Sequence, residues 1–291
     1  MIWNIGERTL DLGHRARVMG ILNTTPDSFS DGGRHDDLER AMRHARTMIA
    51  EGAEIIDIGG ESTRPGAESV RGDEEIRRTA PVVRTLRAEW EGFISIDTMK
   101  AEVAEAALEA GADIVNDVSG LAADGAMAPL CAAFGCGVVV MHMRGTPQTM
   151  QYEPIYQNVA DEVADWLAGR HEALTAAGIS PEALCYDPGI GFGKTLDHNL
   201  ALLRALPEIA PAGRPLLLGV SRKSCIAGIL GETEIEKRDW PTVAITARAR
   251  DQGVMLHRVH QVRQNVEALR MIEAIRFPKP VPVPNDECRC V

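Results

Sequence analysis

The stretch MIAEGAEIIDIGGEST at residues 48–63 contains the pattern that decides the fold of this chain. It joins the end of an amphipathic helix to Gly52, then to the mainly apolar run 54–58, and finally to polar residues. A glycine suits the left-handed cap that ends a helix, and a short apolar run is typical of a strand buried on both faces of a parallel sheet. The stretch therefore predicts one helix–strand unit of an α/β protein.

The same unit recurs along the chain. It appears at residues 108–120, 131–145 and 250–262, with Gly111, Gly135 and Gly253 at the cap positions. The helix before residue 50 has an i, i+3, i+4 apolar stripe formed by Leu38, Ala41, Met42, Ala45, Met48 and Ile49. With the weaker units added, we expect strands near 17–22, 54–58, 93–97, 112–116, 137–142, 183–187, 215–220 and 254–259.

Eight strands that alternate with eight helices predict a (β/α)₈ TIM barrel. No linker interrupts the pattern, so we expect one barrel domain over residues 1–277 and a flexible Pro-rich tail over 278–291. An open doubly wound sheet is the alternative. It usually has fewer strands, and no GxGxxG motif follows the first strand here.

The composition excludes several classes of protein. A formal net charge of −11 argues against a nucleic-acid partner, so any anion-binding basic residues must be local. No segment has the length of a signal peptide core or of the ~18 apolar residues of a membrane span, and we expect a cytoplasmic protein without a membrane partner. Of the six cysteines, Cys131, Cys136, Cys185 and Cys225 are expected to be buried thiols. Cys288 and Cys290 in the tail could bind a metal, but two ligands are a weak signal.

Polar residues follow most of the predicted strands. In a barrel the functional site lies at the carboxyl ends of the strands, and each of these residues comes directly after a buried run. Buried carboxylates are costly without partners, so their joint presence on one rim predicts a ligand site. The strand-end residues are Asn23, Asp57, 61–64, Asp97, Asn116, His142, Asp187, 221–224, Arg258 and His260.

These residues divide into two chemical groups. Arg258 and His260 point to the same face of the last strand, and with Lys223 and Asn23 they supply donors that suit a phosphate or diphosphate. Asp97, Asn116 and Asp187 supply acceptors for the N–H edge of a polar heterocycle. An ionised Asp97 would also stabilise positive charge that develops on such a ring. His142 is expected to be a core or wall residue.

Two loops flank this rim. NTTPDSFSDGG at 23–33 and ESTRPGAESV at 61–70 are polar, contain Pro and Gly, and lack an apolar period. We interpret them as lids that exclude water from a reactive intermediate, the alternative being ordinary surface loops.

The motifs of the chain, taken in order, strongly resemble those of the dihydropteroate synthase family of the folate pathway. The resemblance runs from about residue 16 to 276 and rests on MGILNTTPDSFSDGG, IIDIGGESTRPGA, ISIDTMK, IVNDVSG, VVMHMRGTPQTMQ, DPGIGFGK, GVSRKS and HRVH. The family condenses 6-hydroxymethyl-7,8-dihydropterin diphosphate with p-aminobenzoate to give 7,8-dihydropteroate and diphosphate. The resemblance implies an SN1-like mechanism with loop closure and an enzyme that is a target of sulfonamides. It also implies a homodimer. A candidate surface for the dimer is the predicted apolar helix stripe formed by Val266, Leu269, Ile272 and Ile275.

The resemblance also implies a role for each site residue. Asn23 would be the Mg²⁺ ligand, and Asp97, Asn116, Asp187 and Lys223 would bind the pterin. The diphosphate would contact Asn23, Thr63, Arg64, Arg258 and His260. The p-aminobenzoate would contact Thr63, Arg64, Pro65, Phe192 and Ser224. The catalytic set would be Asp97, Lys223, Arg258, His260 and Asn23.

One position departs from the family pattern. The last motif usually reads RVHDV, whereas Gln261 stands here in place of the Asp. This puts in doubt a charge pairing at that position but leaves the reaction class unchanged.

Two other functions remain open from the sequence. A methyltransferase barrel that uses methyltetrahydrofolate has a similar pterin pocket, but it would not need the cations of GVSRKS and HRVH. A non-catalytic pterin-binding protein would not need the complete set of anion and metal positions.

Overall fold

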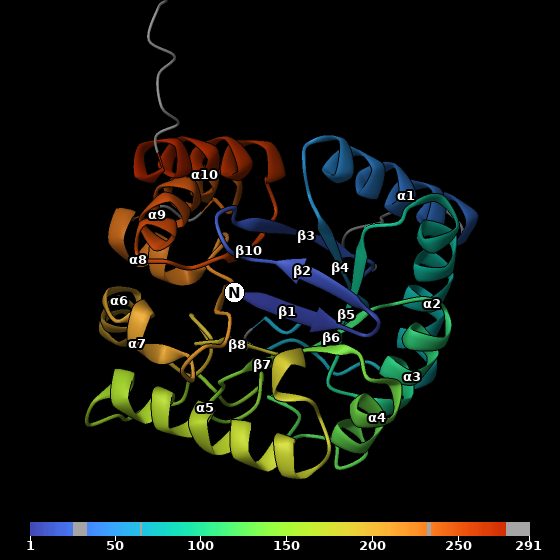
Figure 1. Ribbon diagram of the computed structural model, residues 1–291, viewed down its shortest axis with the longest axis horizontal. Helices are drawn as coiled ribbons and strands as arrows, with labels where there is room; N and C mark the ends of the chain where they lie inside the picture. The colour runs from blue at the N-terminus through green and yellow to red at the C-terminus, as the bar shows by residue number, and fades with distance from the viewer. Residues whose placement is uncertain (26–33, 65, 232–233, 278–291) are drawn as a thin grey trace, which may run out of the picture.

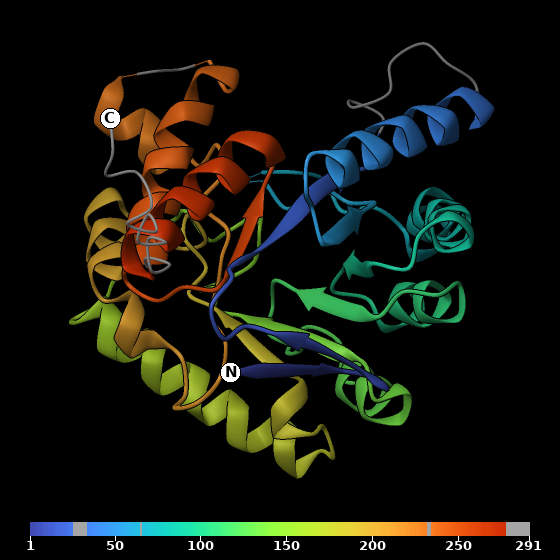
Figure 2. The same cartoon turned by 45° about the horizontal axis from the view of Figure 1, so that its top comes forward.

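A computed structural model of the protein describes residues 1–25, 34–64, 66–231 and 234–277. Its parallel strands form a ring in the order β8-β7-β6-β5-β4-β3-β10-β9, with helices around the outside (Figures 1 and 2). The ring closes where the backbone N–H of Tyr186 donates to the carbonyl of Pro215 at 2.9 Å, beside a bridge from Tyr186 to Leu216. The strands are β3 Arg17–Asn23, β4 Ile55–Gly59, β5 Phe93–Asp97, β6 Ile114–Asp117, β7 Gly137–Met141, β8 Leu184–Asp187, β9 Leu217–Leu218 and β10 Leu256–Val259. The predicted barrel is confirmed, although β9 is shorter than expected.

Helices connect successive strands of the ring. Gly52, Gly111, Gly135 and Gly253 follow α1, α3, α4 and α9 with φ of +104°, +110°, +63° and +100°, so all four predicted caps have the positive φ that favours glycine. The helices are α1 Arg34–Ala50, α2 Gly72–Glu89, α3 Ala101–Glu109, α4 Met127–Phe134, α5 Val159–Ala176, α6 Leu196–Arg204, α7 Leu206–Ile209, α8 Ser224–Leu230, α9 Asp239–Asp251 and α10 Val262–Arg276, with 3₁₀ turns at Pro181–Ala183 and Glu236–Arg238.

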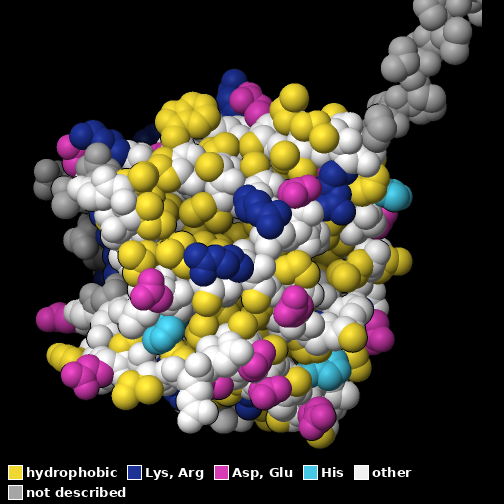
Figure 3. Space-filling model, turned by 90° about the vertical axis from the view of Figure 1, so that its left-hand side faces the viewer, with side chains coloured by type: hydrophobic (Ala, Val, Ile, Leu, Met, Phe, Trp, Pro, Cys, Tyr) yellow, Lys and Arg dark blue, Asp and Glu magenta, His cyan; other side chains and the backbone are white. Residues whose placement is uncertain are grey.

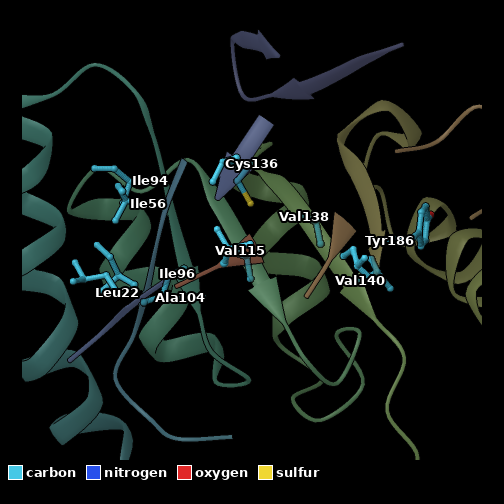
Figure 4. Close-up of a cluster of buried hydrophobic side chains, with 14 of the residues drawn as sticks. Leu22, Ile56, Ile94, Ile96, Ala104, Val115, Cys136, Val138, Val140 and Tyr186 are labelled. Atoms are coloured by element: carbon cyan, nitrogen blue, oxygen red, sulfur yellow. The ribbon is translucent and has the colours of Figure 1, made fainter. Parts of the chain in front are cut away.

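Alternation along the strands creates two cores, because successive side chains point to opposite faces. Ile56, Ile94 and Val138 point outward and pack with the helices (Figure 4). Ile55, Phe93 and Val139 point into the barrel and fill its amino-terminal half. This double burial explains why the strands are almost continuously apolar.

An amino-terminal hairpin, which the sequence patterns did not predict, covers the end of the barrel where the parallel strands begin. It consists of β1 Ile2–Ile5 and β2 Arg8–Asp11 and lies across the ring in Figure 1. Trp3 is fully buried in the inner core and donates its indole N–H to the carbonyl of Ala183 at 2.7 Å. The hairpin acts as a plug that shields the interior apolar layer from water.

Other expectations from the sequence have mixed outcomes. Cys131, Cys136, Cys185 and Cys225 are buried free thiols, as predicted. Among the described residues no helix is long and apolar enough to cross a membrane. The tail 278–291 and residues 26–33 of the first loop lie outside the described residues.

The expected apolar stripe on α10 is not an exposed surface. Leu269 is fully buried in the core, and Val266 packs against the same core. Ile272 is only partly exposed, and of the stripe only Ile275 is largely exposed. The prediction of an exposed stripe was wrong because α10 turns this face toward the barrel. The apolar face of an outer helix normally packs against the core in this way.

Gln261, the residue that departs from the family pattern, is the N-cap of α10, and its side chain makes no capping hydrogen bond. An Asp at an N-cap accepts from backbone N–H groups that otherwise lack a partner, and its charge suits the helix dipole. We expect Gln261→Asp to raise the free energy of unfolding by about 1 kcal/mol. Urea unfolding followed by circular dichroism measures this, with Gln261→Glu as the control, since its longer side chain is a poorer cap. Equal midpoints for Gln261→Asp and the parent would contradict the capping explanation.

Candidate active site

The interior of the barrel changes from apolar to polar toward the carboxyl ends of its strands. On β4, Ile55 belongs to the inner apolar core, and Asp57 follows two positions later on the same face. Asp57 is in register with Ser95 of β5, whereas Asp97 is in register with Asn116 of β6. Asp57 and Ser95 therefore form a layer one step deeper than Asp97 and Asn116.

Arg258 of β10 joins Asp57, Asp97 and Asn116 in one hydrogen-bonded network. Arg258 donates its Nε–H to Asp57 Oδ2 at 2.6 Å and an Nη2–H to Asp97 Oδ2 at 2.5 Å. Asn116 donates from Nδ2 to the same Asp57 oxygen at 3.1 Å. The other oxygens of both carboxylates, Asp57 Oδ1 and Asp97 Oδ1, are buried without a hydrogen-bond partner among the described residues. Acceptors in this state are costly to bury and are available to a ligand that brings N–H groups.

Burial and charge change the pKa values of Asp97 and Arg258 in this network and of Asp187, which lies at the end of β8. Burial raises the pKa of Asp97 to about 7, although the Arg258 guanidinium opposes the rise. Burial also raises the pKa of Asp187, while a backbone N–H from Gly189, at 2.7 Å from Asp187 Oδ1, opposes the rise. The pKa of Arg258 is raised because its carboxylate partners outweigh its burial, so it stays protonated.

Lys223 lies within electrostatic range of Asp187 and Asp97 and contacts an aromatic ring. Its Nζ stands 3.9 Å from the centre of the Phe192 ring, within the range of a cation–π contact. Gly191 permits this arrangement, because a Cβ there would lie 3.2 Å from Lys223 Cδ and its φ is +83°. Burial, together with the charge of Arg258, lowers the pKa of Lys223 to about 8.

His260 lies in a cationic part of the rim. Its backbone N–H donates to Ser221 Oγ at 3.2 Å, and its Nδ1 is 2.9 Å from the same oxygen. Burial, followed by the charges of Arg222, Arg258, Lys223 and Arg64, lowers the pKa of His260 to about 3. When neutral His260 accepts a hydrogen bond from the Ser221 hydroxyl at Nδ1, its own proton is on Nε2. The Nε2–H group can then donate a hydrogen bond to an anion.

The loop that carries Lys223 is held under backbone strain. Arg222 has a φ of +60°, which is uncommon for a residue with a side chain. Its guanidinium is held by both oxygens of Asp239 at 2.7 and 2.9 Å, and its backbone N–H donates to Thr242 Oγ1 at 3.2 Å. Contacts from α9 therefore offset the strain and position Lys223 and Ser224, the exposed first residue of α8.

The second predicted loop is anchored at its base by a partly buried ion cluster. Lys100 donates to Glu75 at 2.6 Å and also to Glu61, the first residue of the loop. Further along, the backbone N–H of Gly66 donates to the carbonyl of Pro147 at 3.3 Å, in the loop after β7. Thr63 is half-buried and Arg64 is exposed, within electrostatic range of His260. Pro65 lies outside the described residues.

The match to known proteins agrees with this geometry. The sequence profile of the family described as "Pterin binding enzyme" matches residues 19–260. The dihydropteroate synthase of Synechocystis is 45% identical over 93% of this chain and 94% of its own length. The chain belongs to the dihydropteroate synthase family.

Solved structures of dihydropteroate synthases have the same fold. The Xanthomonas albilineans dihydropteroate synthase with 4-aminobenzoic acid superposes with a TM-score of 0.89 at 42% identity, covering 95% of this chain and 98% of the other. A structure of the same organism's enzyme in complex with 7,8-dihydropteroate gives 0.85 at 39% identity, covering 95% and 99%. The chain is therefore an enzyme of the transferase class, and the family match favours the predicted function over the methyltransferase and the non-catalytic alternatives.

The arrangement of the dihydropteroate synthase motifs brings some predicted residues together and leaves others apart. Asp97, Asn116 and Arg258 share the network, Lys223 contacts Phe192, and His260 contacts Ser221. Within the described part of the chain, no hydrogen bond or ion pair joins Asn23, Thr63 or Ser224 to that network, although Asn23 ends β3 on the same rim.

Sequence reasoning gave no role to two residues that the structure makes central. Asp57 was noted only as a strand-end residue, yet it contacts both Arg258 and Asn116; its place two residues after Ile55 was the available signal. Lys194 of DPGIGFGK is 3% exposed and hydrogen-bonds His142 Nδ1 and the carbonyl of Phe192, both at 2.9 Å. No sequence signal placed Lys194 beside His142, since 52 residues separate them. His142 itself is buried and packs on Trp166, which agrees with a wall residue.

The residues of the rim can also be tested for their fit to a metal ion. Among the described residues no group of three His, Cys, Asp or Glu side chains could hold one. Asn23 Oδ1 lies at the strand end across Gly59 from Asp97; a Cβ at Gly59 would be 3.9 Å from that amide oxygen and 3.8 Å from Asp97 Oδ2. A single amide oxygen near a carboxylate suits Mg²⁺, which usually takes one or two protein ligands and completes its shell with water and phosphate oxygens.

Proposed function

We propose that this enzyme joins p-aminobenzoate to the methylene carbon of 6-hydroxymethyl-7,8-dihydropterin diphosphate, forming 7,8-dihydropteroate and releasing diphosphate. The observation that carries the proposal is the pairing of an acceptor-lined pocket around Asp97 with a cationic rim around His260. A cation-like ring and an anionic leaving group need these two environments side by side. The relatives bound to 4-aminobenzoic acid and to 7,8-dihydropteroate support the same substrate and product.

The cationic rim favours departure of the diphosphate. The C–O bond breaks with its electron pair moving to the diphosphate oxygen, and Arg258, His260, Thr63 and Arg64 donate hydrogen bonds to the anion as its charge grows. Asn23 would hold Mg²⁺ at this place, and the ion would supply further charge stabilisation for the leaving group. Four cations, Arg222, Arg258, Lys223 and Arg64, lie within electrostatic range of His260, and a bound anion would relieve their mutual repulsion.

The acceptor pocket stabilises what the diphosphate leaves behind. Asp97, Asn116 and Asp187 accept hydrogen bonds from the pterin, and Lys223 donates to it. Positive charge that develops on the pterin spreads over the ring and is held against the Asp97 carboxylate. The reaction is thus SN1-like, since ionisation comes before attack by the amine.

The second substrate approaches past Phe192. We propose that Phe192, Ser224 and the loop residues Thr63, Arg64 and Pro65 form its pocket, and that the loops 23–33 and 61–70 close over the diphosphate. The arylamine nitrogen is neutral at pH 7, so its lone pair attacks the methylene carbon without a strong general base. The proton that the nitrogen then loses passes to diphosphate or water.

The proposed reaction is tested with purified enzyme, pterin diphosphate, p-aminobenzoate and Mg²⁺. We expect one diphosphate released for each 7,8-dihydropteroate detected by mass spectrometry, and no product when p-aminobenzoate or Mg²⁺ is left out. Pterin binding by a folded preparation without any diphosphate release would refute the proposal. A sulfonamide, as a p-aminobenzoate mimic, should compete with that substrate alone.

The pKa values of the site predict a narrow pH optimum. Asp97 must be ionised, and its raised pKa of about 7 causes loss of activity below that pH. Lys223 must be protonated, and its lowered pKa of about 8 causes loss above that pH. We expect kcat/KM for the pterin diphosphate to peak between these values and to fall roughly tenfold per pH unit below about 6 and above about 9. The pKa of the substrate, measured separately by phosphorus NMR, is the control, and a flat profile from pH 5 to 10 would contradict both assignments.

We also propose that the enzyme is a homodimer, formed through helices α8 and α9 instead of the expected stripe on α10. Ile229 and Leu230 of α8 and Trp240 of α9 are all more than half exposed. Figure 3 faces this side of the molecule, where apolar side chains gather around isolated basic ones. Exposed apolar surface of this kind commonly marks an interface.

The dimer is tested by light scattering coupled to size exclusion. We expect a mass of two chains, and Trp240→Glu should weaken the dimer at least about tenfold, or about 1.4 kcal/mol. Trp240→Tyr is the control that keeps an aromatic ring. A monomeric parent at all concentrations would refute the proposal.

A further inference from the structure

Asp57 holds one of the proposed pterin-binding residues in a single orientation. Its Oδ2 accepts from Asn116 Nδ2 at 3.1 Å, and Asp57 is fully buried one layer beneath the site. We propose that Asp57 is a positioning residue that decides which heterocycle the enzyme accepts, because it forces the Asn116 amide to offer its oxygen to the ligand. The inference rests on the proposed function, since it concerns how the same site recognises its pterin.

The orientation of Asn116 follows from hydrogen-bond chemistry. The two ends of a side-chain amide are nearly equal in shape, and only the partners decide which end is the nitrogen. An oxygen that already takes a hydrogen bond from a guanidinium acts as an acceptor, so only the NH₂ end of Asn116 can face Asp57 Oδ2. The amide oxygen is then left on the other side of the amide carbon, toward the layer of Asp97.

Arg258 makes Asp57 Oδ2 an acceptor, which is what this orientation requires. Its Nε–H donates to the same oxygen of Asp57 at 2.6 Å. The raised pKa of Arg258 means that this guanidinium remains charged across the working range of pH. This buried contact with a guanidinium, which can only donate, leaves Asp57 Oδ2 as the acceptor for Asn116.

The resulting pocket presents acceptors side by side. Asp97 and Asn116 are paired in register on β5 and β6, and Asp97 Oδ1 has no partner among the described residues. A ring that carries an exocyclic amine next to a ring N–H satisfies both acceptors. A ring with a carbonyl in place of the amine would set oxygen against oxygen and leave a buried acceptor unpaired, which polar sites reject strongly.

The test measures selectivity between two probes. The dissociation constants of 6-hydroxymethylpterin, which has the 2-amino group, and of 6-hydroxymethyllumazine, which has a 2-oxo group, are measured by calorimetry. For Asp57→Ala we expect the preference for the pterin to fall at least tenfold, because the Asn116 amide can then rotate to offer its NH₂ to the lumazine. Asp57→Asn keeps an oxygen that can accept from both Asn116 and Arg258, so it should retain the parent's preference.

A matched control separates positioning from simple loss of stability. Ser95 is fully buried in the same layer and in register with Asp57, and its hydroxyl has no partner among the described residues. Ser95→Ala therefore removes a buried polar group without touching Asn116, and its preference should stay unchanged. If Asp57→Ala does not fold, Asp57→Ser is used, since its hydroxyl is too short to reach Asn116 and a water molecule in the space could accept or donate.

The outcomes separate this inference from the proposed function. An unchanged preference in folded Asp57→Ala or Asp57→Ser overturns the role of Asp57, even when both ligands bind more weakly, because a merely structural role would lower the two affinities together. A parent enzyme that does not bind the pterin overturns the proposed function instead. A lowered preference in Asp57→Asn equal to that of Asp57→Ala would assign the effect to the charge and also contradict the orientation mechanism.

Discussion

Arg258→Met is expected to lower the free energy of unfolding by about 3–5 kcal/mol at pH 8. The guanidinium holds the carboxylates of Asp57 and Asp97 at 2.6 and 2.5 Å, and both carboxylates are buried. Methionine fills similar space but leaves the two negative charges close together without a partner. Removing one member of a buried ion cluster lowers stability much more than replacing the whole cluster with apolar residues, because it leaves buried charges without a partner.

The size of this loss should depend on pH in a definite direction. Burial already raises the pKa of Asp97 to about 7, and Arg258 opposes that rise, so its removal raises the pKa further. A carboxyl group whose pKa is higher in the folded than in the unfolded protein contributes stability at low pH and loses it as pH rises through the folded value. The deficit of the variant should therefore be largest above pH 8 and should shrink toward pH 5.

Urea unfolding at several pH values measures the deficit. Arg248→Met is the matched control, because Arg248 pairs with Asp251 at 3.2 Å on the exposed surface and should change stability by no more than about 0.5 kcal/mol. Equal effects of the two substitutions would mean that the interior cluster does not depend on Arg258.

Asp97→Asn is expected to lower kcat by about 10²–10³-fold, with a smaller change in the KM for the pterin diphosphate. Asparagine keeps the shape and an acceptor oxygen, so the ground-state contacts largely remain. The negative charge that stabilises the developing pterin cation is lost, and that charge acts mainly in the transition state. The loss should also remove the acid limb near pH 7 from the pH profile.

The measurement is steady-state kinetics with both substrates, together with a trap for diphosphate release. Asp117→Asn is the control, because Asp117 is fully buried on the same strand as Asn116 and has a pKa raised to about 6 by burial, but accepts from the Ser119 N–H outside the proposed network. Turnover of Asp97→Asn within about threefold of the parent would refute the charge-stabilising role.

Residues near each other in a motif were easier to predict than residues joined across the barrel. The rim residues Asn23, Asp97 and Arg258 were found because each follows an apolar strand, and that rule needs only local sequence. The partners Asp57 and Arg258 are 201 positions apart, and nothing local in either segment indicates that they meet. The assignment of Arg258 to the anion alone was therefore incomplete, since its guanidinium also neutralises the acceptor pocket.

The amino-terminal hairpin illustrates the same limit in the fold. Its strands are four residues each, too short for a clear pattern, and Trp3 is buried only because the end of the barrel where the parallel strands begin needs a cover. Burial of this kind depends on an opening that exists only once eight strands have closed into a ring. A local pattern cannot contain that information.

By itself, the sequence determined the barrel, its glycine caps, the family and the set of polar residues on the rim. Those features follow from short-range rules: the period of apolar residues, the left-handed caps and the position of polar residues after buried strands. Only the tertiary structure decided how the rim residues pair, which layer Asp57 occupies and which end of the Asn116 amide faces Asp57. These depend on distances of a few ångströms between strands far apart in the chain, and hydrogen bonds form or fail over such distances.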